Sequence, residues 1–424
     1  MAKEHAVVLD PDPPRLHLKD SGAATLPSLG KVLRDPAANW PARLLDTGIE
    51  LAMAERRRIA FVAEPEAVST ILQNRNDAFP RARIQDRILG ASYGENLIQA
   101  QQEDWRRTRR NVAQPITSER ALSLVPRIHL ALADMLAEWE GYAQDEPIPL
   151  QRDARRLTLD TLHRAMFADE NEARQRDSLV DQTARSIADR HPIELKEELG
   201  LLSTLATRLV GDWQDRHGTH TPPPFPQDLN TLTLFLHAGH DNASAAFTWM
   251  LWLVAHLPEL QKDVREEWRA NREGVFSLSR LPVALAVVRE TLRLYPPVIQ
   301  VIREVRSGLA VGEVELPAGS LAIMSIYAMQ RHRAIWSQPD DFRPERFVQA
   351  DGDERRRRAA WMPFGTGPRG CTGSSLAQIE LVLFLALICD RFDIAPNPAC
   401  PLRMAVEWTQ RPVGERPIFL RARR

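Results

Sequence analysis

The sequence predicts a mainly α-helical fold in one domain. Two segments have the composition of long buried helices: residues 229–256, and residues 375–389, which are apolar on almost every side. Between residues 122 and 217, apolar positions recur at helical spacing in three or four further segments. No low-complexity linker divides the 424 residues, so we expect one domain over residues 27–424, preceded by an N-terminal extension, residues 1–26.

The composition excludes several classes of partner. The 55 basic and 56 acidic residues nearly balance, which disfavours nucleic acid or an anionic membrane as the main partner. Three cysteines do not make a disulfide framework and fit a reducing compartment. The first 20 residues are charged and broken by prolines, without the apolar core of a signal peptide or membrane anchor. We therefore expect a soluble, cytoplasmic protein.

In the first quarter of the chain, extended and helical patterns alternate. Residues 56–74 indicate a strand followed by an amphipathic helix. Residues 81–97 have no clear period and are expected to form a loop. The segment after this loop, residues 103–112, is predicted to be a helix that carries Trp105 and Arg109 on one face, four positions apart.

The middle of the chain is interpreted as a helical region that precedes one dominant helix. The strand-like residues 146–151 and the segment 191–200 separate the amphipathic helices, and the proline-rich residues 219–228 mark a loop. The apolar helix of residues 229–256 is long enough to cross a whole domain, since about 28 residues span roughly 42 Å. At its centre lies the sequence Ala-Gly-His-Asp-Asn, residues 238–242.

A second feature is a pair of opposite charges on one helix face. Glu290 and Arg293 are three positions apart within an apolar helical segment. Taken alone, such a pair is typical of a surface ion pair. The segment is followed by Tyr295 and two prolines, and farther on by the sequence Phe-Arg-Pro-Glu-Arg-Phe, residues 342–347.

The strongest local signal is a glycine-rich loop, residues 363–373, that contains Cys371. Glycines on both sides of the cysteine allow tight turns and the close approach of a ligand. The positive end of the following helix would stabilise a thiolate. One thiolate without neighbouring ligands disfavours a structural zinc site and suits haem iron with an axial cysteine.

The loop also carries a family pattern. Phe364, Gly367, Arg369, Cys371 and Gly373 match each fixed position of F-x-x-G-x-R-x-C-x-G, and the chain resembles the cytochrome P-450 haem-thiolate monooxygenases. Four motifs occur in the family's order, from about residue 27 to the C-terminus. The resemblance implies a mainly α fold with small antiparallel β-sheets, haem b, and the soluble bacterial type of the family.

The resemblance also assigns roles to individual residues. Cys371 would bind the iron, Trp105, Arg109, Arg303 and Arg369 would bind the haem propionates, and Phe364 and Gly365 belong to the cofactor-binding loop. Glu290, Arg293 and Arg346 would form a buried network behind the haem. The loop over residues 81–97 would cover the pocket, with Ile88, Leu89 and Tyr93 as candidate walls, although ordinary surface packing is an equal alternative for each.

The oxygen site departs from the family pattern at one position. Ala238 and Gly239 match small residues that leave room for dioxygen, and Asp241 matches an acid, but Asn242 stands where threonine is usual. A carboxamide positions water or dioxygen by hydrogen bonds without readily giving up a proton. We expect Asn242 to position dioxygen or water and Asp241 to connect the site to solvent protons. His237, one turn earlier, is expected to pair with Asp241, and His240 to be ordinary packing.

The expected function is insertion of one atom of dioxygen into a small apolar organic substrate. Electrons would come from separate proteins, a ferredoxin with its reductase, because no flavin or iron–sulfur domain is appended; we expect a monomer. The arginine run 355–358 is either a solvated loop or a docking surface for an acidic donor, with Arg106 and Arg107 contributing. Two alternatives stay open: a peroxide-using or rearranging haem-thiolate enzyme, and a non-catalytic haem-thiolate ligand sensor.

Overall fold

The fold is described from a computed structural model of the chain. It describes residues 14–16, 18, 25–26, 32, 39–54, 56–73, 77–84, 94–100, 102–142, 145–168, 172–174, 177–190, 194–218, 220, 225–226, 228–306, 308–311, 314–348, 354–406 and 409–423. The candidate pocket walls Ile88, Leu89 and Tyr93 lie outside these residues.

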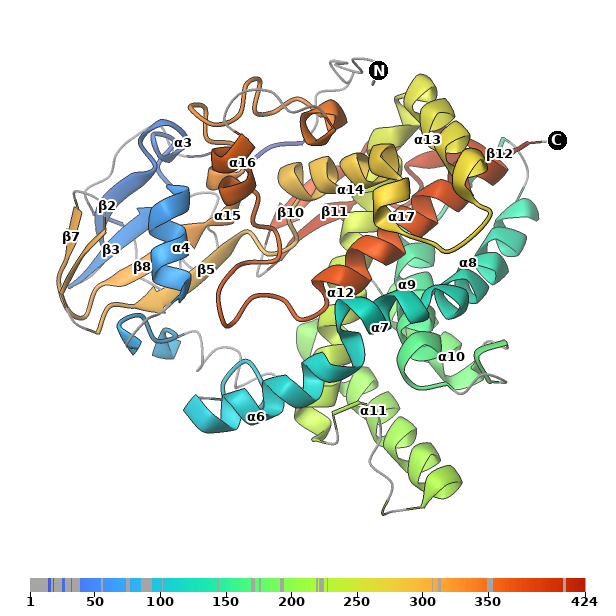
Figure 1. The fold of residues 1–424 in the computed structure, drawn as a ribbon, viewed down its shortest axis with the longest axis horizontal. Coiled ribbons are helices and arrows are strands. Elements are labelled where there is room, and N and C mark those ends of the chain that lie inside the picture. Colours follow the sequence, from blue (N-terminus) through green and yellow to red (C-terminus); the bar gives the residue numbers. More distant parts are fainter. Residues whose placement is uncertain are drawn as a thin grey trace. The chain divides into compact units, whose positions relative to one another are not determined.

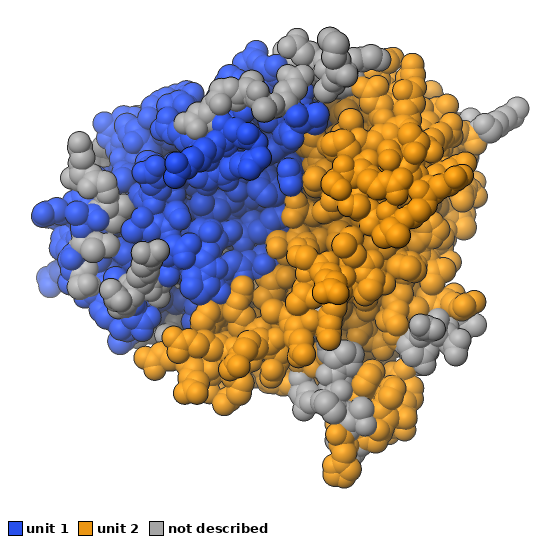
Figure 2. Space-filling view, viewed as in Figure 1, with its two compact units in different colours: residues 1–85, 289–371, 402–413 blue, residues 86–288, 372–401, 414–424 orange. Residues whose placement is uncertain are grey.

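The chain divides into two compact units (Figure 2). Unit 1 comprises residues 1–85, 289–371 and 402–413, and unit 2 comprises residues 86–288, 372–401 and 414–424. Each unit is therefore built from segments that are distant in the sequence. The two units are described separately below.

A five-stranded sheet forms the centre of unit 1 (Figure 1). Its order is β1 (Thr25–Leu26), β2 (Ile49–Ala54), β3 (Arg57–Val62), β8 (Leu321–Ser325) and β5 (Gln300–Glu304). The β2–β3 hairpin is antiparallel, whereas β3 pairs with β8 in parallel. The expectation of antiparallel sheets was incomplete, because β3 and β8 come from distant segments and no short turn fixes their direction. β1 uses the last two residues of the expected N-terminal extension.

Short helices and hairpins complete unit 1. The helices are α3 (Leu44–Thr47), α4 (Pro65–Gln73), α15 (Ile326–Met329) and α16 (Glu354–Ala360). Two hairpins pair β6 (Leu309–Val311) with β7 (Val314–Leu316), and β10 (Arg403–Val406) with β11 (Gln410–Val413). The arginine run 355–358 lies in α16, so the interpretation as a loop was wrong.

Unit 2 is mostly helical. Its helices are α6 (Gln102–Ala113), α7 (Ser118–Ser123), α8 (Val125–Glu140), α9 (Leu150–Met166), α10 (Ser178–Asp189), α11 (Leu195–His217), α12 (Leu229–Ala255), α13 (Pro258–Asn271) and α17 (Ser374–Arg391). A small antiparallel sheet orders β4 (Pro147–Ile148), β12 (Ile418–Ala422) and β9 (Phe392–Pro396). Helix α14 (Pro282–Leu294) begins in unit 2 and ends in unit 1.

Helix α12 is the central element of unit 2. Asp228 caps its N-terminus by accepting hydrogen bonds from the backbone amides of Asn230 and Thr231. Its second half is buried on every side, and it packs against α9, α11 and α17 (Figure 1). The rings of Phe247 in α12 and Phe384 in α17 meet edge to face, 5.3 Å apart. These contacts hold the segment 238–242 on a rigid helix.

The mainly α-helical fold is confirmed, as are the two long apolar helices. One boundary was wrong: residues 191–200 were expected to separate helices, but α11 begins at Leu195. The segment contains Pro192 and a run of charge, which hid the start of an otherwise regular helix. None of the described helices is both long and apolar enough to span a bilayer.

Candidate active site

The cysteine loop of unit 1 is held by three backbone hydrogen bonds, two of which close tight turns. The amide of Gly365 donates to Met362 O at 3.0 Å, that of Gly370 to Gly367 O at 3.0 Å, and that of Cys371 to Phe364 O at 2.8 Å. Gly365 and Gly367 have φ values of 66° and 72°, which side chains rarely adopt. The Cys371 side chain is exposed, and the three cysteines of the chain, all described, form no disulfide. The loop therefore presents one thiol at its end.

The loop rests on the end of α4. A Cβ atom added to Gly367 would lie 2.5 Å from Leu72 O, closer than any real contact allows. Trp361 packs edge to face on Phe364 at 6.0 Å and donates from Nε1 to Arg289 O at 3.0 Å. The glycine is therefore required by the close approach of two backbones as well as by its own conformation.

Behind the loop in unit 1 lies the expected charge network. Glu290 accepts hydrogen bonds from Arg293 Nε at 2.6 Å and Nη2 at 2.7 Å, and from Arg346 Nε at 3.1 Å. The side chains of Glu290 and Arg293 are completely buried. Arg293 also donates to the backbone oxygens of Gln330, Pro339 and Asp341. The structure thus confirms a buried network rather than a surface ion pair.

Two further arginines of unit 1 were expected to bind carboxylates. Arg303 lies in the edge strand β5, is buried, and donates from Nη1 to Ile302 O at 2.9 Å. Arg369 is half-buried in the cysteine loop. The propionate-binding role of both residues stays a prediction.

In unit 2, Trp105 and Arg109 share one face of α6, as expected. The guanidinium carbon of Arg109 lies 5.9 Å from the centroid of the Trp105 ring, and both side chains are half-buried. Arg106 and Arg107, on the other side of the helix, are exposed, and Arg107 pairs with Asp104 at 2.8 Å. A pair of donors is thus separated from the solvated charges of the same helix.

The two small residues of α12, Ala238 and Gly239, lie in different surroundings, although both were expected to leave room for dioxygen. Ala238 and Gly239 are both exposed. A Cβ atom on Gly239 would lie 2.8 Å from Leu162 Cδ2 of α9. The missing side chain of Gly239 therefore lets α12 pack closely against α9. Ala238 is a small residue on an exposed face of α12, and its role beside dioxygen stays a prediction.

Asn242 uses only half of its amide group within α12. Its Nδ2 donates to Ala238 O, one turn earlier, at 3.0 Å. Its Oδ1 is buried and has no hydrogen-bond partner. If the amide were flipped, Oδ1 would face Ala238 O, and two acceptors would repel each other. The contact with Ala238 therefore assigns Nδ2 to that side and Oδ1 to the unpaired position. Asn242 therefore has an unpaired acceptor, Oδ1, and one further Nδ2 hydrogen that the contact with Ala238 does not use.

Asp241 faces a cluster that the sequence did not reveal. Its Oδ1 accepts from Arg155 Nη2 of α9 at 2.9 Å. His237 and His240 both approach Glu198 of α11, at 3.8 and 3.2 Å between Nε2 and Oε1. The expectation that His240 is ordinary packing was wrong, because its ring faces a buried carboxylate. Arg155 and Glu198 were missed because their charged, amphipathic segments are typical of solvated helix faces.

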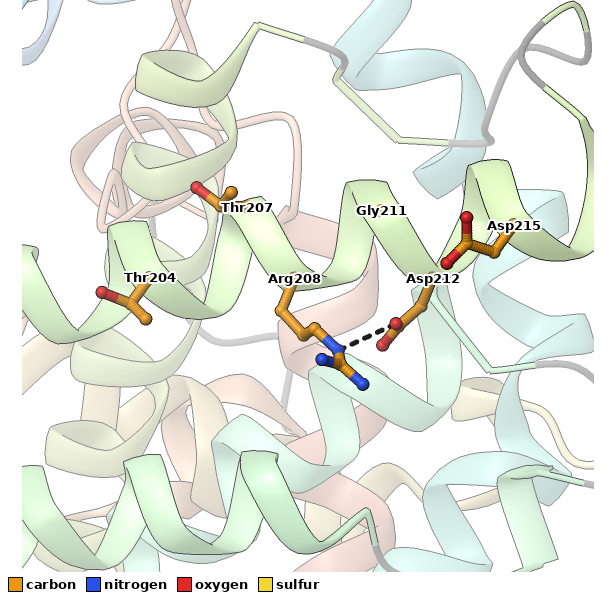
Figure 3. A pocket seen from close by; sticks show the side chains of 6 residues that line it. All are labelled: Thr204, Thr207, Arg208, Gly211, Asp212 and Asp215. Atoms are coloured by element: carbon orange, nitrogen blue, oxygen red, sulfur yellow. Dashed lines mark ion pairs between the residues drawn. The ribbon is translucent and has the colours of Figure 1, made fainter.

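A surface depression on α11 is unrelated to these residues (Figure 3). It is lined by Thr204, Thr207, Arg208, Gly211, Asp212 and Asp215. Arg208 and Asp212 form an ion pair at 2.8 Å along the same helix. None of the expected site residues lines it, and a single exposed helix face does not enclose a ligand.

Comparison with known proteins identifies the family. The family model described as Cytochrome P450 matches residues 51–219 and 227–414. The chain belongs to the cytochrome P450 family, whose members are haem-thiolate oxidoreductases that bind haem b. The resemblance expected from the loop pattern is confirmed.

The relatives come from plants and mammals. Cytochrome P450 4X1 of Mus musculus is 34% identical over 191 residues, which are 44% of this chain and 37% of the relative. Cytochrome P450 714C3 of Oryza sativa subsp. japonica is 26% identical over 386 residues, covering 80% and 75%. Cytokinin hydroxylase of Arabidopsis thaliana is 26% identical over 377 residues, covering 79% and 73%. These relatives lend no support to the expected bacterial type.

The residues present fit a haem. The loop of unit 1 presents one thiol in a rigid turn, as a single axial ligand requires. The side chains of Trp105, Arg109, Arg303 and Arg369 are donors of types suited to carboxylates. On α12, an exposed alanine and an orphaned acceptor at Asn242 supply a small, partly polar surface.

Proposed function

We propose that the chain is a haem-thiolate monooxygenase that inserts one atom of dioxygen into a small apolar organic substrate. The observation that carries the proposal is the loop of Cys371, in which backbone hydrogen bonds and two glycines of positive φ present one thiol. The resemblance implies that this thiol is the iron ligand. The proposed domain covers residues 27–424, with residues 1–26 as an extension.

The residues that would hold the cofactor are those named from the sequence. Cys371 would ligate the iron through Sγ, with Phe364 and Gly365 shaping its loop. Trp105, Arg109, Arg303 and Arg369 would donate hydrogen bonds to the propionates. When bound, haem iron supplies the oxygen-activating chemistry, and the protein contributes binding, orientation and protons.

The partners of Asn242 support a narrower role than the sequence suggested. Its Nδ2 donates one of its two hydrogens to Ala238 O, while the buried Oδ1 has no hydrogen-bond partner. An acceptor holds a group that carries a proton, and dioxygen carries none. We therefore assign to the unpaired Oδ1 of Asn242 the orientation of a water molecule. Asp241 would exchange protons with that water.

The electron donor is proposed to be a ferredoxin-type protein with its reductase, acting on a monomeric, cytoplasmic enzyme of the soluble type. The exposed arginines of α16 support an acidic donor. Several relatives are named as hydroxylases, among them the cytokinin hydroxylase of Arabidopsis thaliana and the taurochenodeoxycholic 6 alpha-hydroxylase of Sus scrofa. These names favour hydroxylation as the reaction without transferring either substrate.

The proposal is tested by spectroscopy on the purified holoenzyme. A panel of fatty acids, terpenes, steroids and aromatics is titrated while the ferric absorption band is followed. A shift from low to high spin is expected with at least one compound, since a substrate expels water from iron, and that compound should be oxidised when reduced donor and dioxygen are supplied. A tight ligand that is never converted would contradict the proposal and support a sensor.

The same assay separates the peroxide-using alternative. This alternative has one observation in its favour, namely that Asn242 has no hydroxyl to pass a proton. Product formation with reduced donor is expected to exceed that with hydrogen peroxide. The reverse order would identify a peroxide-using enzyme instead.

A further inference from the structure

Five charged or titratable side chains of unit 2 meet on three helices. Arg155 comes from α9, Glu198 from α11, and His237, His240 and Asp241 from α12. Their side chains are at most 13% exposed. A cluster so deeply buried has to balance its charge internally, because water screens it poorly.

Glu198 is the centre of this cluster. Its Oε1 lies 3.2 Å from His240 Nε2, 3.6 Å from Arg155 Nη1 and 3.8 Å from His237 Nε2. No hydrogen bond of good geometry is made by Glu198 Oε1, His240 Nε2 or Arg155 Nη1. By contrast, Arg155 Nη2 makes a direct hydrogen bond to Asp241 Oδ1 at 2.9 Å. The guanidinium thus bridges two carboxylates and is bound firmly to only one of them.

Among these five side chains, the charges do not cancel while both histidines are neutral. One guanidinium then faces two carboxylates, and a single proton on either imidazole restores the balance. Burial alone would raise the pKa of Glu198, but His240, His237 and Arg155 outweigh it and hold the pKa below its usual range. Burial lowers the pKa of His237, and the charges of Asp241 and Glu198 oppose this effect. The histidines are therefore the groups on which the balance turns.

We propose that Glu198 is a positioning residue for Asp241, because both carboxylates compete for the guanidinium of Arg155. The charge on His237 and His240 determines which of the two carboxylates binds Arg155. This inference rests on the proposed role of Asp241 in proton exchange. A protonated histidine neutralises Glu198, which leaves Arg155 to Asp241. With neutral histidines, Glu198 draws Arg155 away, and Asp241 is released to carry protons.

The inference fixes the sign of a pH effect. The fraction of donated electrons recovered in product should rise as pH rises through the titration of His237, because Asp241 is then released. Replacing Glu198 by glutamine leaves Asp241 as the only carboxylate of the cluster on Arg155. That variant should couple electrons several-fold less well at high pH and show a flat profile.

The chain offers a matched control on the same helix. Glu197 precedes Glu198, is half exposed, and pairs with Arg190 instead of with the cluster. Glu197→Gln removes the same charge one residue away. It is expected to keep the coupling and the pH profile of the parent protein.

The first readout is independent of turnover. Histidine signals of the ferrous, carbon monoxide-bound holoenzyme are titrated by NMR in the parent protein, Glu198→Gln and Glu197→Gln. Loss of the Glu198 charge should lower the pKa of His237 further, since that charge favours the imidazolium. An unchanged titration in Glu198→Gln would overturn the inference, whatever the coupling.

The second readout is the pH profile of coupling, measured with the panel compound that gives the largest spin-state shift. Asp241→Asn is measured beside Glu198→Gln. Loss of coupling in Asp241→Asn with a normal, rising profile in Glu198→Gln would overturn this inference and leave the role of Asp241 standing. Normal coupling in Asp241→Asn would overturn both. Low, flat coupling in Glu198→Gln together with a parent-like Glu197→Gln supports the inference.

Discussion

The carboxylate of Glu290 accepts hydrogen bonds from three different residues. Besides three bonds from Arg293 and Arg346, it accepts one from the backbone amide of Arg343 at 2.8 Å. It therefore ties α14 to the segment that precedes the loop in the chain. Because the carboxylate is completely buried, its desolvation is offset only while all of these donors are in place.

Glu290→Ala is predicted to destabilise the protein by about 3–5 kcal/mol, because it leaves buried guanidinium groups without their acceptor. Denaturant unfolding of the holoenzyme measures the change, and haem content after purification is expected to fall with it. The control is Glu354→Ala, which removes an exposed carboxylate that pairs with Arg358 and should cost less than about 1 kcal/mol. Equal stability of the two variants, with full haem content, would contradict the proposed role of Glu290.

At the residue scale, the sequence predicted what is encoded locally. Cys371 with its glycines and the pair of Glu290 with Arg293 each lie within a few positions of one another, so spacing predicted that they are neighbours. Spacing alone favoured a surface ion pair, and only the family resemblance implied that Glu290 and Arg293 are buried. The cluster of Arg155 and Glu198 joins helices that are far apart in the chain, and each residue alone resembles a solvated charge. Only the packing of α9 and α11 on α12 brings these two side chains together.

Among the helices, α17 carries an unusual buried acid. Glu380 lies on the apolar helix that follows the cysteine loop, is buried, and has an Oε1 without a hydrogen-bond partner. Burial raises the pKa of Glu380 to about 8, from an ordinary value of 4.5. The helix therefore contains a carboxyl group that stays protonated at neutral pH when the protein is folded.

Glu380→Gln is predicted to gain stability relative to the parent protein as pH rises from about 5 to about 8. In the parent, the unfolded chain loses this proton above its ordinary pKa while the folded chain keeps it until about pH 8, so the contribution of Glu380 to stability is lost across that range. Glutamine stays neutral in both states. Thermal unfolding of the ferric holoenzyme measures the stability of both proteins. The predicted quantity is the change with pH of the stability difference between Glu380→Gln and the parent.

The matched control for this titration is Glu259→Gln on α13, where the carboxylate is exposed. The stability difference between Glu259→Gln and the parent should not change with pH over the same range. A difference between Glu380→Gln and the parent that is likewise independent of pH would show that Glu380 ionises normally in the folded protein.

At the element scale, long apolar segments predicted the helices reliably. Helices α12 and α17 agree with the expected segments to within one or two residues, because most of their side chains are apolar. The sheets were less predictable. The pairing of β3 with β8 joins segments that are distant in the sequence, and neither segment carries information about its partner. Packing therefore decides the sheet, and local sequence decides the helices.

For the whole molecule, charge is nearly balanced, with a formal net charge of −1. A charged electron donor therefore gains little from the overall field, and its recognition has to depend on local groups. Helix α16 supplies such a group, since Arg355, Arg356 and Arg358 are exposed on its surface. Local fields of this kind act within a Debye length, which is about 10 Å at 0.1 M salt.

Raising ionic strength is accordingly predicted to slow electron transfer from an acidic ferredoxin-type donor and to leave the affinity for an apolar ligand nearly unchanged, because apolar binding does not depend on screened charges. Arg355→Glu should slow the transfer several-fold at low salt and remove much of the salt dependence. Arg421→Glu, at an exposed position of β12, is the matched charge reversal and should behave like the parent. Stopped-flow reduction of the ferric holoenzyme measures the rates, and equal effects of the two reversals would place the docking surface elsewhere than α16.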